Sequence, residues 1–85
     1  MSKTFDVTET LDVKGLNCPM PVAKTGQAVK ELDDGDVLEV VATDSGSMSD
    51  LAAWADSTDG VAMLDQEEGE EAGEAVYRHF VEVTA

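Results

Sequence analysis

The 85-residue sequence predicts one α/β (α+β) domain spanning residues 1–85, a two-layer sandwich with the element order βαβαββ. Strand-like segments of period two alternate with segments of helical period, and the last two strands follow each other directly. A chain of this length can bury only one modest core, and two short helices can cover only one face of a sheet. We therefore expect a mixed four-stranded sheet with both helices on one face.

The first half of the chain predicts a strand and a helix. Residues 5–13 alternate apolar and polar side chains, and Gly15 interrupts the pattern. From Pro19 onward the apolar spacing becomes helical, and proline is favoured in a first helical turn. The helix is expected to end near Gly35, which can supply a left-handed C-terminal residue. Four residues form its predicted inner stripe: Val22, Thr25, Val29 and Leu32.

The second half predicts three strands and a helix. Residues 37–43 are β-branched and almost continuously apolar, which is typical of a central strand. Ser47 to Asp50 have the spacing of a capping box, so Ser47 is the expected N-cap of a helix that ends before Gly60. Strands are expected at residues 61–64 and 76–83. The glycine-punctuated acidic stretch 66–74 is interpreted as a solvated hairpin loop, because it lacks the ligand spacing of a calcium loop.

The charge is strongly negative, with 19 acidic and 5 basic residues giving −14. Such a surface repels phosphates and anionic membranes, so we expect neither autonomous nucleic-acid binding nor membrane insertion. No apolar run resembles a signal peptide or a membrane span, which favours a cytoplasmic protein, and we expect a monomer. The acids are spread widely, as in halophilic proteins, so stability should rise with salt. Acidification to about pH 5 should change it little, since carboxylates titrate near 4.

The only cysteine, Cys18, precedes Pro19-Met20-Pro21, which places it at or beside the helix N-terminus. There the helix dipole and free backbone N–H groups would favour a thiolate. Lys14 and Lys24 would add positive charge, and the prolines would fix the direction of the thiol. A structural zinc site is nearly excluded, because one Cys and one His cannot supply four ligands.

Other interpretations of the cysteine have less support. A free cysteine is commonly a small buried side chain. A Cys–His hydrolase would have to use His79, the only histidine, which lies in a strand pattern. A soft metal such as Cu(I) bound by Cys18 and Met20 would have too few ligands. A redox-sensing thiol in a non-catalytic regulatory or adaptor module remains the alternative function, although the chain lacks a resolving cysteine.

Leu11-Asp12, Gly15-Leu16 and Cys18-Pro19-Met20-Pro21-Val22 together resemble the signature of the TusA/SirA-like family of small sulfur carriers. The similarity covers about positions 9–64. It implies that Cys18 accepts sulfane sulfur as a persulfide and passes it on without a cofactor or metal. Gly15, Leu16, Pro19 and Pro21 would then support the thiol, while Lys14, Asn17, Met20 and Lys24 would contact partners or act electrostatically.

The resemblance also implies partners: a sulfur donor, such as a cysteine desulfurase or rhodanese-like protein, and an acceptor in a sulfur relay. Family members serve tRNA thiolation, sulfur oxidation, molybdenum cofactor maturation or uptake of sulfur compounds. Two departures bear on the choice of pathway. Trp54-Ala55 stands where some relatives have an aromatic residue and a second cysteine, and Asn17 replaces a frequent basic residue.

Overall fold

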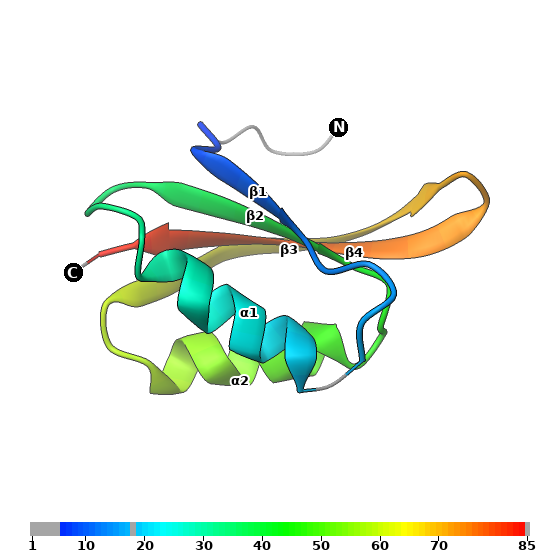
Figure 1. Ribbon diagram of the computed structural model, residues 1–85, viewed down its shortest axis with the longest axis horizontal. Helices are drawn as coiled ribbons and strands as arrows, with labels where there is room; N and C mark the ends of the chain where they lie inside the picture. Colours follow the sequence, from blue (N-terminus) through cyan, green and yellow to red (C-terminus); the bar gives the residue numbers. More distant parts are fainter. Residues whose placement is uncertain (1–5, 18, 85) are drawn as a thin grey trace.

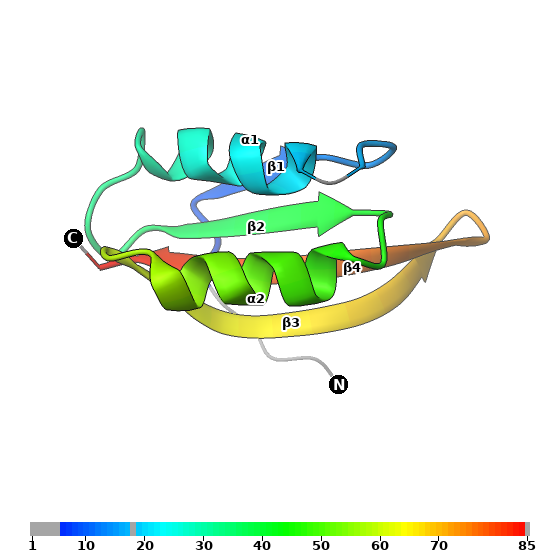
Figure 2. The ribbon, with the colours of Figure 1, turned by 90° about the horizontal axis from the view of Figure 1, so that it is seen from below.

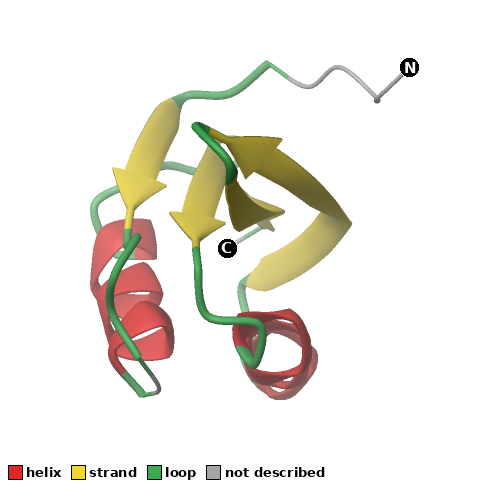
Figure 3. Ribbon diagram, turned by 90° about the vertical axis from the view of Figure 1, so that its right-hand side faces the viewer, coloured by secondary structure: helices red, strands yellow, loops and turns green. Residues whose placement is uncertain are grey.

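The computed structural model describes residues 6–17 and 19–84. Its elements are β1 (Glu9–Asp12), α1 (Met20–Val29), β2 (Val37–Ala42), α2 (Ser47–Ser57), β3 (Val61–Glu71) and β4 (Glu74–Val83). The strand order is β1-β2-β4-β3, with β1 parallel to β2 and the other two pairings antiparallel (Figures 1 and 2). Both helices lie on the same face of the sheet (Figure 3). The predicted fold class is confirmed.

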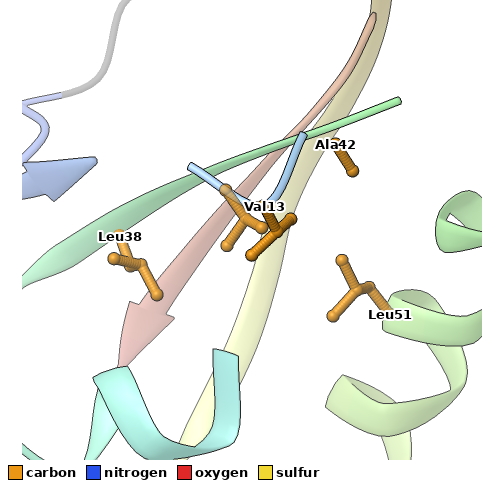
Figure 4. Close-up of a cluster of buried hydrophobic side chains, with 5 residues drawn as sticks. Val13, Leu38, Ala42 and Leu51 are labelled. Carbon is orange, nitrogen blue, oxygen red and sulfur yellow. The ribbon is translucent and has the colours of Figure 1, made fainter. Parts of the chain in front are cut away.

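The core lies between the sheet and the helices and is centred on β2. Leu38, Val40 and Ala42 alternate along the strand and are fully buried, together with Val13 and Leu51 (Figure 4). Val37 and Val41 point to the opposite face and are also nearly buried, each 7% exposed. Burial on both faces explains why this strand reads as a continuous apolar run.

The first strand and helix are both shorter than predicted. β1 begins at Glu9, although Thr8 donates its N–H to Val37, and the predicted start at Phe5 lies outside the described residues. α1 ends at Val29, and the next three N–H groups bond three residues back instead of four, which tightens the chain into a turn. Gly35 has the predicted left-handed conformation, with a φ of 92°.

The predicted capping box at Ser47 is wrong. The N-cap of α2 is Gly46, and no side chain caps the helix. Asp44 organises the chain here instead, since its Oδ1 accepts the Gly46 N–H at 3.1 Å and its carbonyl accepts the Ser47 N–H at 2.9 Å. Ser47 is buried and its hydroxyl is directed to the sheet, so it is unavailable for the cap.

The predicted acidic loop at residues 66–74 is also wrong. β3 and β4 pair continuously from Gln66↔His79 to Glu71↔Glu74, and Ala72-Gly73 form a two-residue turn. The hairpin extends beyond the helices (Figure 1), so its outer part needs no apolar face and acidic side chains can reach solvent from it. A bulge between Met63 and Asp65 shifts the register where the strand leaves the core.

Within the described ranges, neither helix is long and apolar enough to cross a membrane.

Candidate functional site

The candidate site is the connection between β1 and α1, the loop that contains Cys18. Cys18 itself lies outside the described residues, so its position at the helix N-terminus remains a prediction. Several backbone N–H groups hold the described chain before it, and the Val13 N–H bonds the Val41 carbonyl at 2.9 Å. The Lys14 N–H bonds Asp12 Oδ1 at 2.9 Å, the Gly15 N–H bonds Thr43 Oγ1 at 2.9 Å, and the Leu16 N–H bonds the Val13 carbonyl at 3.2 Å.

The backbone conformation at position 15 favours glycine in this loop. Its φ of 83° is left-handed, a conformation that disfavours other residues, and no neighbouring atom would obstruct a Cβ there. The backbone conformation, and not a lack of space, therefore explains the glycine. The turn brings Leu16 back to pack partly buried against the core.

The chain after Cys18 is fixed by the start of α1. Pro19 is the N-cap, Pro21 is buried in the first turn, and the Thr25 hydroxyl donates to the Pro21 carbonyl at 2.7 Å. The Met20 N–H bonds the Asn17 carbonyl at 2.9 Å, and the Ala23 N–H bonds the Pro19 carbonyl at 3.0 Å.

These bonds alter the expected chemistry of the helix start. Proline has no N–H, so Pro19 and Pro21 offer no donors, and those of Met20 and Ala23 are already bonded. The sequence suggested several free N–H groups for the sulfur, and the described part of the helix start offers fewer.

The two predicted lysines differ in their surroundings. Lys14 lies 3.1 Å from a carboxylate oxygen of Glu71 and 4.0 Å from Asp12, and the hydrogen bond to Glu71 is the main cause of its raised pKa. Its charge is therefore largely compensated by acids. Lys24 is exposed on α1, one turn beyond the loop. The expected positive patch thus depends on Lys24 more than on Lys14.

Two further predicted contact residues are accessible. Met20 is 42% exposed, and Asn17, three residues before it, is exposed as well. The described residues of the predicted site thus gather at the loop and the first turns of α1, and Lys14 is directed away toward the hairpin.

Sequence reasoning missed Thr43, Glu71 and Arg78 at this site. Thr43 and Glu71 are 28 and 57 residues from their partners in the loop, and no local pattern reports such contacts. Arg78 did carry a signal, because it is the only basic residue after position 30. It bonds Glu71 at 2.6 Å and lies 3.7 Å from Glu39.

His79 is a buried structural residue. Its Nδ1 lies 3.0 Å from Gln66 Nε2, which also donates to the Met48 carbonyl, and its Nε2 lies 3.0 Å from Ser47 Oγ. With Gln66 donating to Nδ1, we assign the proton to Nε2, which then donates to the serine. Burial lowers the pKa of His79 to about 4.

This arrangement argues against a hydrolase. The proton on Nε2 is directed at Ser47, so the imidazole cannot act as a base toward that hydroxyl. Both side chains are buried, with His79 0% and Ser47 1% exposed, so neither meets a substrate. Among the described residues, no group of three His, Cys, Asp or Glu side chains could hold a metal ion.

A groove of about 620 Å³ separates the two helices on the side away from the sheet's hairpin. Trp54 lines it opposite Gly26, where an added Cβ would lie 3.9 Å from the indole nitrogen. None of the described loop residues 13–17 lines this groove. Ala55, which the resemblance aligns with a second cysteine of some relatives, is 7% exposed and is not among the residues that line this groove.

Comparison with known proteins identifies relatives along nearly the whole chain. Residues 9–83 match the family model described as sulfurtransferase TusA. A Halobacterium salinarum protein named provisionally as a sulfur carrier is 57% identical over 84 residues, which are 99% of each chain. The sulfur carrier protein TusA of Allochromatium vinosum is 41% identical over 75% of this chain and 84% of its own.

A solved structure agrees with the fold. The crystal structure of a SirA-like protein from Desulfitobacterium hafniense superposes with a TM-score of 0.64 at 27% identity. The match covers 86% of this chain and 95% of that one.

Proposed function

Because the chain belongs to the sulfurtransferase TusA family, we propose that it is a sulfur carrier that holds sulfane sulfur as a persulfide on Cys18. The observation that supports this proposal is the position of the only cysteine, Cys18, in the sequence. In the chain it follows a loop that is hydrogen-bonded to Thr43, the residue after β2, and it precedes a helix start that contains two prolines. A thiol between two fixed segments suits repeated presentation to partner proteins.

The proposed reaction is a thiol-to-thiol transfer of one sulfur atom. The Cys18 thiolate attacks the outer sulfur of a donor persulfide, the donor S–S bond breaks, and the donor leaves as a thiolate. The product is a Cys18 persulfide. An acceptor thiolate then attacks its outer sulfur and releases the Cys18 thiolate, so no net oxidant, metal or cofactor is consumed.

The proposed partners are a donor such as a cysteine desulfurase or rhodanese-like protein and an acceptor within a sulfur relay. Exposed Asn17, Met20 and Lys24 would form the contact, because they flank Cys18 in the loop and first turns of α1. The net charge of −14 opposes direct RNA binding, so a route toward tRNA thiolation would need an intermediary protein.

Mass spectrometry tests the proposal directly. After incubation with a cysteine desulfurase and cysteine, the intact protein should gain one sulfur atom, and a reductant should remove it. Cys18→Ala should gain none, while Met20→Ala should retain the chemistry and lose transfer rate to partners. Absence of the adduct with desulfurase, rhodanese and inorganic polysulfide donors would contradict the proposal. Faster formation of a stable sulfenic acid than of a persulfide would favour the redox-sensing alternative.

A further inference from the structure

Glu71, the last residue of β3, connects the β3–β4 hairpin to the loop that contains Cys18. Its Oε1 accepts a hydrogen bond from Lys14 Nζ at 3.1 Å, and its Oε2 accepts one from Arg78 Nη2 at 2.6 Å. The hairpin and the β1–α1 loop lie at the same end of the molecule (Figures 1 and 2). One carboxylate therefore uses a separate oxygen for each of two cations from different segments.

The local sequence of the hairpin accommodates this arrangement. A Cβ at Gly69 would lie 2.7 Å from Arg78 Nη1, which is closer than real contacts allow. The absence of a side chain at Gly69 thus leaves room for the guanidinium to lie across β3 toward Glu71. Arg78 is also 3.7 Å from Glu39 on β2, so the cluster connects the hairpin with the central strand.

The charges of Lys14, Glu71 and Arg78 stabilise one another. Hydrogen bonds and charge from Lys14, and then from Arg78, lower the pKa of Glu71, which favours its ionised form. The Lys14 and Glu71 side chains are 39% and 40% exposed, so each pair alone is weak and screened by salt. Sharing one carboxylate makes the pairs interdependent, since loss of Glu71 removes the shortest ion pair of both cations and leaves only the longer ones to Asp12 and Glu39.

We infer that Glu71 is a positioning residue that acts through Lys14 to hold the loop on which Cys18 lies. Lys14 is the residue whose N–H is bonded to Asp12, and it directly precedes Gly15, whose N–H is bonded to Thr43. Holding the Lys14 side chain stabilises both bonds. The importance of this for sulfur transfer rests on the proposed function, whereas the contact itself does not.

Amide hydrogen exchange at Lys14, Gly15 and Leu16 tests the inference without any sulfur chemistry. Glu71→Gln and Lys14→Gln should each accelerate exchange there by about two- to fivefold in low salt, the range expected for an exposed pair. The double variant should exchange no faster than the single ones. Lys14→Arg, which keeps the charge, should exchange as slowly as the unaltered protein. Gly69→Ala, which displaces Arg78 without changing charge, should have a smaller effect of the same sign.

Glu70→Gln is the matched control, because it removes the same charge from the neighbouring residue of β3. Molar NaCl should erase the difference between Glu71→Gln and the unaltered protein. Equal exchange in Glu71→Gln and the unaltered protein would overturn the inference, as would an equal acceleration by Glu70→Gln. A failure to load sulfur on Cys18, with these exchange results intact, would instead reject the proposed function alone.

Discussion

We predict that the imidazole of His79 makes stability depend on pH between about pH 4 and 6.5. Burial lowers its pKa to about 4 in the folded protein, against 6.5 in an unfolded chain. Between these values the unfolded chain binds the proton and the folded protein does not, so stability falls as the pH is lowered. The sequence-based expectation that pH 5 changes little considered carboxylates only, and the burial of His79 leads us to predict the opposite.

We predict that His79 alone lowers the free energy of unfolding by about 2 kcal/mol at pH 5 and by about 3 kcal/mol at pH 4, relative to pH 7. Urea unfolding at these pH values measures it. His79→Gln keeps an amide that can bond Ser47 and Gln66 but cannot titrate, so its stability should be nearly flat between pH 7 and 5. A slope as steep in His79→Gln as in the unaltered protein would assign the effect to other groups.

In the β1–α1 loop and at α2, residue types predict backbone conformation better than they predict which residues are in contact. The sequence correctly predicts the two prolines at the helix start, because the lack of an N–H is a property of each proline alone. It predicts a left-handed conformation for Gly35 and not for Gly15, which has it too. Ser47 was misread, because its capping spacing is local and its hydrogen bond to His79 spans 32 residues. Long-range polar pairs of this kind leave no local pattern.

Among the elements, the β3–β4 hairpin departs most from the sequence-based expectation. Its outer half is acidic and lacks the apolar alternation that predicts a strand, so its sequence indicates a loop. Cross-strand backbone bonds and the pairing of Glu71 with Arg78 hold it instead. All six elements have the predicted type, because burial imposes a period on the parts of their sequence that border the core.

The turn of this hairpin offers a stabilising substitution. Ala72 and Gly73 have φ values of 51° and 81°, the pattern of a type I′ turn, in which Asn-Gly is preferred. A left-handed alanine costs roughly 1–2 kcal/mol, most of which asparagine avoids. Ala72→Asn should therefore raise the melting temperature by about 4–8 °C.

Gly73→Ala is the complementary variant and should lower the melting temperature. No atom lies within 4 Å of a Cβ at this position, so any loss must come from the backbone conformation. Calorimetric melts of both variants measure the effects. Opposite signs are expected, and destabilisation by Ala72→Asn would contradict the turn type.

For the molecule as a whole, the charge balance should decide stability. Five cations cannot neutralise 19 acids, and residues 31–85 contain 16 acids and one base. The molecule measures 36 × 29 × 19 Å, comparable to the Debye length of about 30 Å at 0.01 M salt, so nearly all charges repel one another there. At 1 M this length is about 3 Å, and only neighbours interact. A domain this small has a margin of only about 3–5 kcal/mol.

We therefore predict that molar KCl raises the melting temperature substantially, by about 4–8 °C for each kcal/mol of repulsion removed, and that low salt loosens the fold. Circular dichroism melts from 0.01 to 2 M KCl measure this. Sodium sulfate at matched ionic strength separates screening from the exclusion of salt from the surface, because screening depends on ionic strength alone. Ion pairs such as Lys14–Glu71 weaken in salt and oppose the trend, but two cations hold few of the acids. A melting temperature that does not change with salt would mean that the unpaired carboxylates lie too far apart to repel, and the halophilic interpretation of the surface would then be wrong.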